Sequence, residues 1–165
     1  MNFEEIYIKH YRKLFCFAFQ CTLSKHDSED LVQETFTRFL KEIRRGTEIN
    51  NTQAWLYKVL TNLINTNKSR AKQQIWKLKQ NGSAMQSEDF QTEYSSDEKK
   101  RIISGELKQM PSDERKLLIL YNRGLKYEEI AEILDMNPNS VGTTLARTIQ
   151  KFRNTLKTKY HELFE

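Results

Sequence analysis

The 165-residue chain has few residues that interrupt helices or cross-link a fold: two prolines, five glycines and two cysteines. Proline and glycine are the strongest markers of turns, so there are few places at which a helix must end. Apolar residues recur at helical spacing in nearly every segment, and no alternating pattern typical of strands persists. The sequence therefore predicts an all-α protein.

Long apolar runs are also missing. No stretch approaches the roughly 20 residues that a membrane helix needs. The first residues include acids and lack the apolar core of a signal peptide. We therefore expect a cytoplasmic protein without membrane insertion.

The residues that bind metals are few and scattered. Cys16 and Cys21 lie in an aromatic-rich segment with no further ligand at suitable spacing, so we interpret them as buried free thiols. The three histidines are far apart in the sequence: His10, His26 and His161. We expect no metal site and no cofactor.

The usual signatures of enzymes are absent from the sequence. It has no paired carboxylates beside a metal cluster, no glycine-rich phosphate loop and no nucleophile with a neighbouring base. We therefore expect neither an enzyme nor a small-molecule substrate, and we rank an enzyme acting on nucleic acid as a weak alternative.

Composition divides the chain into two helical parts. Residues 81–98 are polar and contain five acids but no base, a composition typical of a flexible linker. We therefore predict a first domain over residues 1–80, a flexible acidic linker over 81–100 and a second small helical domain over 101–165.

Three helices are expected in the first domain. Asn2 should begin a helix that extends to about Gln20. Asp27 should cap a second helix, which Gly46 ends. A third helix is expected over residues 53–79.

Residues 125–153 have the pattern of a helix-turn-helix. Asp135 and Met136 interrupt the apolar spacing, and Asn137 followed by Pro138 is suited to begin a second helix. The first helix carries apolar residues at helical spacing, Tyr127, Ile130, Ala131, Ile133 and Leu134, and the second is expected to have Val141, Leu145, Ile149 and Phe152 on its inner face. Such a second helix reads base edges in the DNA major groove, although an ordinary helical hairpin has the same apolar pattern.

Charge favours the DNA-binding interpretation. Between Asn139 and Tyr160 the sequence has five basic residues and no acid, and attraction to phosphates supplies most of the non-specific affinity for DNA. We expect base-edge contacts from Asn139, Ser140, Thr143, Thr144 and Arg147, and phosphate contacts from Lys151 and Arg153.

Three segments resemble those of one known family. They are DSEDLVQETF (residues 27–36), AWLYKVLTNLINTNKSR (54–70) and MPSDERKLLILYNRGLKYEEIAEIL (110–134). They look like the polymerase-binding helix, the −10 promoter helix and the C-terminal signature of extracytoplasmic-function (ECF) RNA polymerase sigma factors of the sigma-70 family. The order and separation of the first and third segments are the most specific part of the resemblance.

The resemblance implies a function and its partners. Such a sigma factor binds core RNA polymerase, directs it to promoter DNA and recognises the −10 and −35 elements. An anti-sigma factor is an expected further partner. Residues 1–80 would be the region 2-like domain, and residues 101–165 the region 4-like domain that binds the −35 element.

The resemblance also assigns roles in the first domain. The outer stripe of the second helix would dock on the polymerase, unless it is an ordinary solvated face; it consists of Asp30, Gln33, Glu34 and Arg38. The loop before the third helix would read −10 bases through Asn50, Asn51 and Thr52. One face of the third helix would follow phosphates, with Lys58, Asn62, Asn65, Lys68 and Arg70. We expect Trp55 to pack in the core.

Three departures from the family pattern affect the second domain. Asp135 replaces the usual turn glycine and tolerates left-handed geometry. Gly142 and Thr144 replace residues that are often basic, which leaves the −35 sequence open, and Met110 replaces leucine. A stand-alone transcriptional regulator with the same helix-turn-helix is the other function we consider; it would bind a palindromic site without polymerase.

Overall fold

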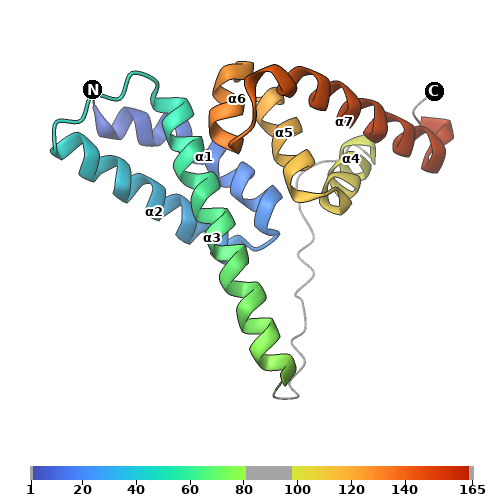
Figure 1. Cartoon of the computed structure of the whole chain (residues 1–165), viewed down its shortest axis with the longest axis horizontal. Helices are drawn as coiled ribbons and strands as arrows, with labels where there is room; N and C mark the ends of the chain where they lie inside the picture. The colour runs from blue at the N-terminus through green and yellow to red at the C-terminus, as the bar shows by residue number, and fades with distance from the viewer. Residues whose placement is uncertain (1, 81–97, 164–165) are drawn as a thin grey trace. The chain divides into compact units, whose positions relative to one another are not determined.

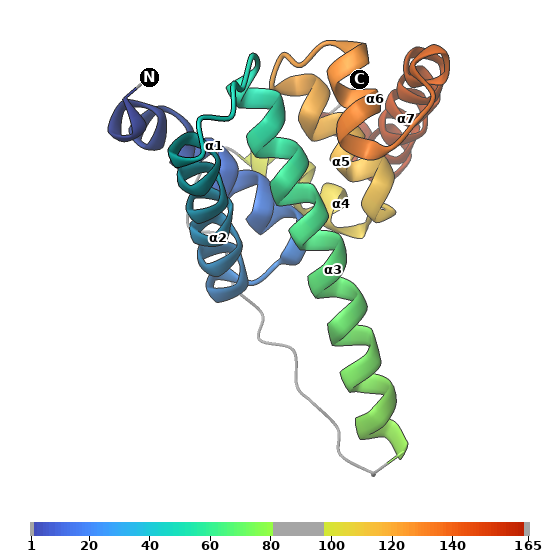
Figure 2. The same cartoon turned by 60° about the vertical axis from the view of Figure 1, so that its left-hand side comes forward.

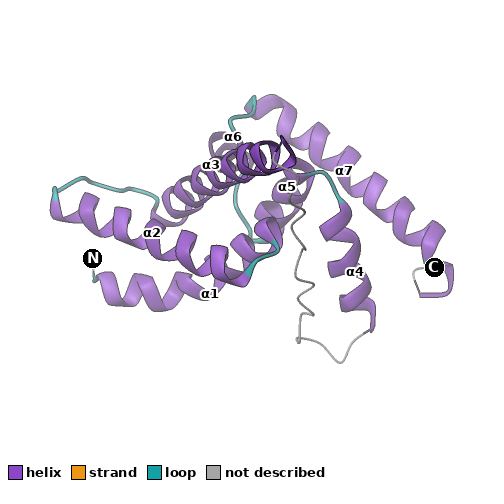
Figure 3. Ribbon diagram, turned by 90° about the horizontal axis from the view of Figure 1, so that it is seen from below, coloured by secondary structure: helices purple, strands orange, loops and turns teal. Residues whose placement is uncertain are grey.

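The computed structural model describes residues 2–80 and 98–163, and the side chains of residues 2–69 and 98–162. It divides into two compact units, Met1–Thr92 and Glu93–Glu165, which are described separately below. The described residues form seven α-helices and one short 3-10 helix, without strands (Figure 3). The predicted all-α class is confirmed. None of the described helices is both long and apolar enough to span a membrane.

The first unit is a bundle of three helices that all pack on one another. They are α1 (Phe3–Thr22), α2 (Lys25–Arg44) and α3 (Thr52–Gln80) (Figure 1). Side chains with no exposed surface fill the space between them: Leu14, Phe17, Val32, Phe39, Leu56, Leu60 and Ile64. Trp55 packs on Phe39 with ring centroids 5.5 Å apart, as the sequence predicts.

Two helix ends in this unit follow local sequence signals. The Asn2 side chain accepts a hydrogen bond from the backbone N–H of Glu4 at the start of α1. Gly46 follows the end of α2 with φ +77°, a left-handed conformation that glycine adopts without steric cost.

The prediction that Asp27 caps α2 is wrong. Ser24 is the cap, since its Oγ accepts a hydrogen bond from the Asp27 backbone N–H at 3.2 Å and its backbone is extended. Asp27 instead lies in the first turn, where its negative charge favours the helix N-terminus. Two capping residues three positions apart compete for one helix start, and the backbone conformation decides between them.

The second unit contains the remaining elements. They are α4 (Glu98–Gln109), α5 (Ser112–Asn122), α6 (Tyr127–Leu134), α7 (Pro138–Lys159) and the 3-10 helix η1 (His161–Leu163). Helices α5, α6 and α7 pack on one another (Figure 2). Their core contains Leu117, Leu120, Ile130, Ala131, Ile133, Val141 and Leu145, each at most 3% exposed.

The connection between α6 and α7 is the predicted helix-turn-helix turn. Asp135 adopts the expected left-handed conformation with φ +53°. Asn137 caps α7, because its side-chain oxygen accepts a hydrogen bond from the Asn139 backbone N–H at 2.9 Å, and Pro138 is the first helical residue. Ala131 is 3% exposed, and its small side chain allows α6 and α7 to pack closely.

Candidate nucleic-acid and protein interfaces

The outer face of α7 carries the predicted base-reading residues. Asn139, Thr143 and Arg147 are exposed, while Ser140 and Thr144 are half-buried. The Ser140 hydroxyl donates to the Asn137 carbonyl at 2.8 Å, so it reinforces the start of the helix. Helical periodicity places Asn139, Thr143 and Arg147 on the side opposite the buried Val141 and Leu145, whereas Thr144 lies only about 60° around the helix from Val141. The structure therefore brings three of the five predicted residues together on one accessible stripe, with Ser140 and Thr144 at its half-buried margin.

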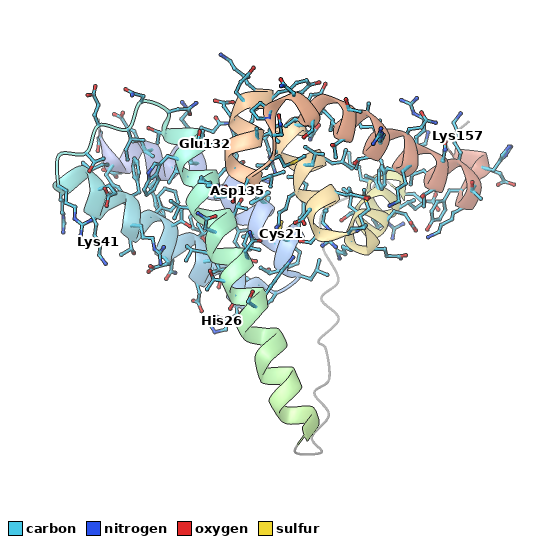
Figure 4. All side chains as sticks on the ribbon, in the orientation of Figure 1. Cys21, His26, Lys41, Glu132, Asp135 and Lys157 are labelled. Carbon is cyan, nitrogen blue, oxygen red and sulfur yellow. The ribbon has the colours of Figure 1, made fainter. Side chains whose placement is uncertain are left out.

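The two predicted phosphate-binding residues flank this stripe. Helical periodicity places Lys151 and Arg153 on opposite edges, about 160° apart around α7, and both are exposed. Lys157 projects from the C-terminal half of the same helix (Figure 4). Arg153 and Lys157 thus extend the basic surface, whereas Lys151 already has a partner within the unit.

Acids from two other helices reach the basic side chains of α7. The Lys151 ammonium group lies 3.0 and 3.1 Å from the two carboxylate oxygens of Glu114 on α5. The Lys159 ammonium group lies 2.8 and 3.1 Å from those of Glu106 on α4. Sequence reasoning missed both acids, because they precede their partners by 37 and 53 residues and no local pattern connects them.

Glu106 is the buried member of a three-residue cluster. It is 5% exposed and accepts a further hydrogen bond from the Tyr160 hydroxyl at 3.0 Å. The hydrogen bond from Lys159 lowers the pKa of Glu106, although burial opposes this shift. The same contacts raise the pKa of Lys159 and of Tyr160. The cluster therefore fixes the end of α7 to α4 through a charged carboxylate.

An aromatic side chain lies against the recognition helix. Tyr127, one of the apolar residues at helical spacing in α6, is 42% exposed and still packs on α7. A Cβ atom at Gly142 would lie 3.3 Å from Tyr127 Cε2, so the ring rests on the backbone of α7. The ring of Tyr127 also lies near that of Tyr121, at a centroid distance of 6.2 Å. The missing side chain at Gly142 provides the space for this packing.

The predicted docking stripe is continuous along α2. Asp30, Gln33 and Arg38 are exposed and Glu34 is half-buried, on the side away from the buried Val32 and Phe39. The Arg38 Nε donates to Glu34 Oε1 at 2.7 Å, and Asp30 Oδ2 lies 3.6 Å from His26 Nδ1. The stripe thus presents both signs of charge, and three of its four members already have such a contact within α2.

The three predicted base-reading residues before α3 have different structural roles. Asn51 caps α3, because its side-chain oxygen accepts a hydrogen bond from the Ala54 backbone N–H at 3.0 Å. Asn50 is exposed in the preceding bend, and Thr52 is the half-buried first residue of the helix. The three residues are adjacent. A DNA base that contacted the Asn51 side-chain oxygen would have to share it with the hydrogen bond that caps α3.

The predicted phosphate face of α3 is only partly a single face. Lys58, Asn62 and Asn65 share one side of the helix by periodicity, with both asparagines exposed. Lys68 lies about 80° around the helix from Lys58. The backbone of Arg70 belongs to α3, but its side chain lies outside the described residues. The structure therefore brings three of the five residues together.

No group of three or more histidine, cysteine or acidic residues that could hold a metal ion occurs among the residues whose side chains the structure describes. Cys21 is buried and Cys16 half-buried, and neither belongs to a disulfide. The surfaces that remain to be explained are therefore a helix-turn-helix and two polar helix faces.

Both units match the same protein family. The Sigma-70 region 2 family covers residues 6–74, and the Sigma-70, region 4 family covers residues 100–152. The chain is also 30% identical over 138 residues to the ECF RNA polymerase sigma factor EcfG of Rhodopseudomonas palustris, an alignment that covers 81% of this chain and 72% of that protein. The chain belongs to the ECF group of the sigma-70 family.

Other members of the group align over almost their full length. The RNA polymerase sigma factor YlaC of Bacillus subtilis is 28% identical, with 98% of this chain and 96% of that protein covered. The ECF sigma factor SigM of the same organism is also 28% identical, with coverages of 93% and 94%. The fold is that of the sigma factor RpoE of Bartonella quintana, solved with the anti-sigma factor NepR, at a TM-score of 0.77, 22% identity and coverages of 94% and 96%.

The sigma factor assignment confirms the function expected from the resemblance. Sigma factors of this family are transcription initiation factors that act with core RNA polymerase on promoter DNA, so this protein directs promoter-specific initiation. In this sigma factor the left-handed Asp135 preserves the turn of the region 4 helix-turn-helix. Gly142, a further departure on that motif, makes room for Tyr127.

Proposed function

We propose that the second unit recognises the −35 element through the outer stripe of α7. The observation that carries this proposal is the set of exposed polar side chains on a recognition helix whose described residues include no acid. Asn139, Thr143 and Arg147 have the exposure that base-edge contacts need, with Ser140 and Thr144 beside them. Arg153 and Lys151 are suited to phosphates on the two edges of the helix.

We propose that the first unit contributes the −10 contacts and the main polymerase contact. Asn50 is the best-placed base reader, because it is exposed and precedes the capping Asn51. Lys58, Asn62 and Asn65 would follow the strand backbone, with Thr52, Lys68 and Arg70 as further contacts. The stripe Asp30, Gln33, Glu34 and Arg38 would dock on core polymerase.

The same proposal covers the organisation of the chain. Residues 1–80 would form the region 2-like domain and 101–165 the region 4-like domain, with a linker over 81–100. Residues 81–97 of that linker lie outside the described residues, and residues 98–100 belong to α4. Two weak contacts on one chain would act together when polymerase holds both domains in place.

Three further properties belong to the proposal. The protein acts in the cytoplasm, has no enzymatic activity of its own and is held inactive by an anti-sigma factor. The last property is supported by the complex of the structurally similar RpoE with the anti-sigma factor NepR.

Run-off transcription tests the proposed function. Bacterial core polymerase and a library of promoter fragments are incubated with and without the protein, and the transcripts are sequenced. Start sites that appear only with the protein are expected, and their alignment gives both promoter elements. Binding to DNA without any new start site would instead favour a stand-alone regulator.

A further inference from the structure

The phosphate-binding edge of the recognition helix carries an internal competitor. Lys151 follows Arg147 by four residues, so the two side chains lie one turn apart on the same edge of α7. No ion pair joins Arg147 to any of the residues whose side chains are described, whereas Lys151 contacts both carboxylate oxygens of Glu114 at 3.0 and 3.1 Å. A phosphate that approaches Lys151 therefore meets a carboxylate already in place.

The ion pair between Lys151 and Glu114 is weak enough for Lys151 to exchange the carboxylate for a phosphate. The Lys151 side chain is 61% exposed and that of Glu114 is 30% exposed, and exposed ion pairs are only weakly stabilising. The pair of Lys159 with Glu106 differs, because Glu106 is buried and also accepts a hydrogen bond from Tyr160. Of these two contacts to α7, the one made by Glu114 is the one that DNA can displace.

The charge balance indicates the direction of the effect. A carboxylate beside the ammonium group cancels most of its attraction for phosphate, and it repels any phosphate that takes its place. Each lysine that neutralises a phosphate adds about 0.9 to the salt dependence of DNA binding. Engagement of Lys151 by Glu114 removes part of that contribution from the wild-type protein.

We propose that Glu114 competes with promoter phosphates for Lys151 and thereby lowers the affinity of the −35 interface. The inference rests on the proposed −35 role of α7. A sigma factor that binds its −35 element less tightly depends more on the −10 contacts and is released more easily after initiation. Glu114 is then an affinity-setting residue of the interface that makes no contact with a base.

The test compares polymerase holoenzymes that contain full-length variants of the chain. The probe is a promoter fragment recovered in the run-off experiment, and its affinity is measured over a series of potassium chloride concentrations. Glu114→Gln removes the competing charge. Asp113→Asn is the matched control, because it makes the same charge change one residue away, at a carboxylate that pairs with Lys116 at 3.1 Å.

We expect Glu114→Gln to bind about two- to fivefold more tightly than wild type at moderate salt. Its plot of log affinity against log salt should be steeper by about one. Asp113→Asn should leave both quantities unchanged. Lys151→Gln should remove the gain, so that the double variant Glu114→Gln/Lys151→Gln binds like Lys151→Gln alone.

Two results would overturn the inference. Equal behaviour of Glu114→Gln and Asp113→Asn would mean that Lys151 is not restrained, and weaker binding by Glu114→Gln would mean that Glu114 supports the lysine. Arg147→Ala separates this failure from that of the proposed function: a holoenzyme with Arg147→Ala and wild-type affinity refutes the −35 interface itself. Far-ultraviolet circular dichroism verifies that each variant is folded.

Discussion

Gly142 gives the sharpest test of how the recognition helix is built. Glycine inside a helix is less favourable than alanine by about 0.8–1 kcal/mol, so Gly142→Ala should stabilise α7 if nothing else changed. The new Cβ would lie 3.3 Å from Tyr127 Cε2, which is slightly closer than ordinary contact. Because Tyr127 is 42% exposed, its ring can move outward at small cost.

The matched control is the other helical glycine of the same unit. A Cβ at Gly105 in α4 would have no described heavy atom within 4 Å, so Gly105→Ala should show the full propensity gain of about 0.5–1 kcal/mol. We expect Gly142→Ala to gain about half of that, since the ring displacement offsets part of it. In a Tyr127→Ala background, Gly142→Ala should recover the full gain.

The two units can be followed separately during unfolding. Both tryptophans, Trp55 and Trp76, belong to the first unit, so their fluorescence in a urea titration reports that unit alone. Far-ultraviolet circular dichroism reports both units, and the transition that fluorescence does not follow belongs to the second. Equal gains for Gly142→Ala with and without Tyr127 would refute the contact, and a loss above about 1 kcal/mol would show that the ring cannot move.

Three further predictions follow from the described contacts. Ser24→Ala should destabilise the first unit by about 1 kcal/mol, measured by tryptophan fluorescence in urea, whereas Asp27→Ala should cost less than half as much. A larger loss for Asp27→Ala than for Ser24→Ala would show that Asp27 is the cap. Glu106→Gln should destabilise the second unit at neutral pH by about 1–3 kcal/mol. The folded state lowers the pKa of Glu106 below its ordinary 4.5, so the stabilisation is present above pH 4.5 and is lost as the pH falls through the lowered pKa. The difference in unfolding free energy between Glu106→Gln and wild type, measured in urea, should therefore vanish in acid. A difference that stays constant with pH would contradict the cluster. Asn50→Ala should impair promoter opening, measured by permanganate footprinting, without weakening polymerase binding. Asn51→Ala should also lower the stability of the first unit by about 1 kcal/mol, because Asn51 caps α3. Equal loss of opening and of polymerase binding in Asn50→Ala would count against the role of Asn50 as a base reader.

The sequence was informative wherever the deciding interactions are local. Helical spacing predicts the helices because the residues that pack together are three or four positions apart. Asn137 with Pro138 marks the start of α7, and Asp135 marks the end of α6, because caps and turns depend on the side chains next to them. The resemblance to the family rests on three segments whose order the sequence shows directly.

Competition between local signals was harder to resolve. Ser24 and Asp27 both favour the first turn of a helix, and which of them caps α2 depends on the extended backbone that leads out of α1. Tyr127 has the spacing of an inner residue, but its ring lies against Gly142 of the neighbouring helix. The local backbone conformation decides the first case, and a tertiary contact decides the second.

The sequence by itself determined the helical class, the helix-turn-helix and the acid-free run of basic residues on α7. It could not determine how much of that positive charge faces DNA. The acids that pair with Lys151 and Lys159 come from α5 and α4, far away in the chain. Only the packing of these helices brings the opposite charges within hydrogen-bond distance, because electrostatic interaction depends on separation in space and not along the sequence.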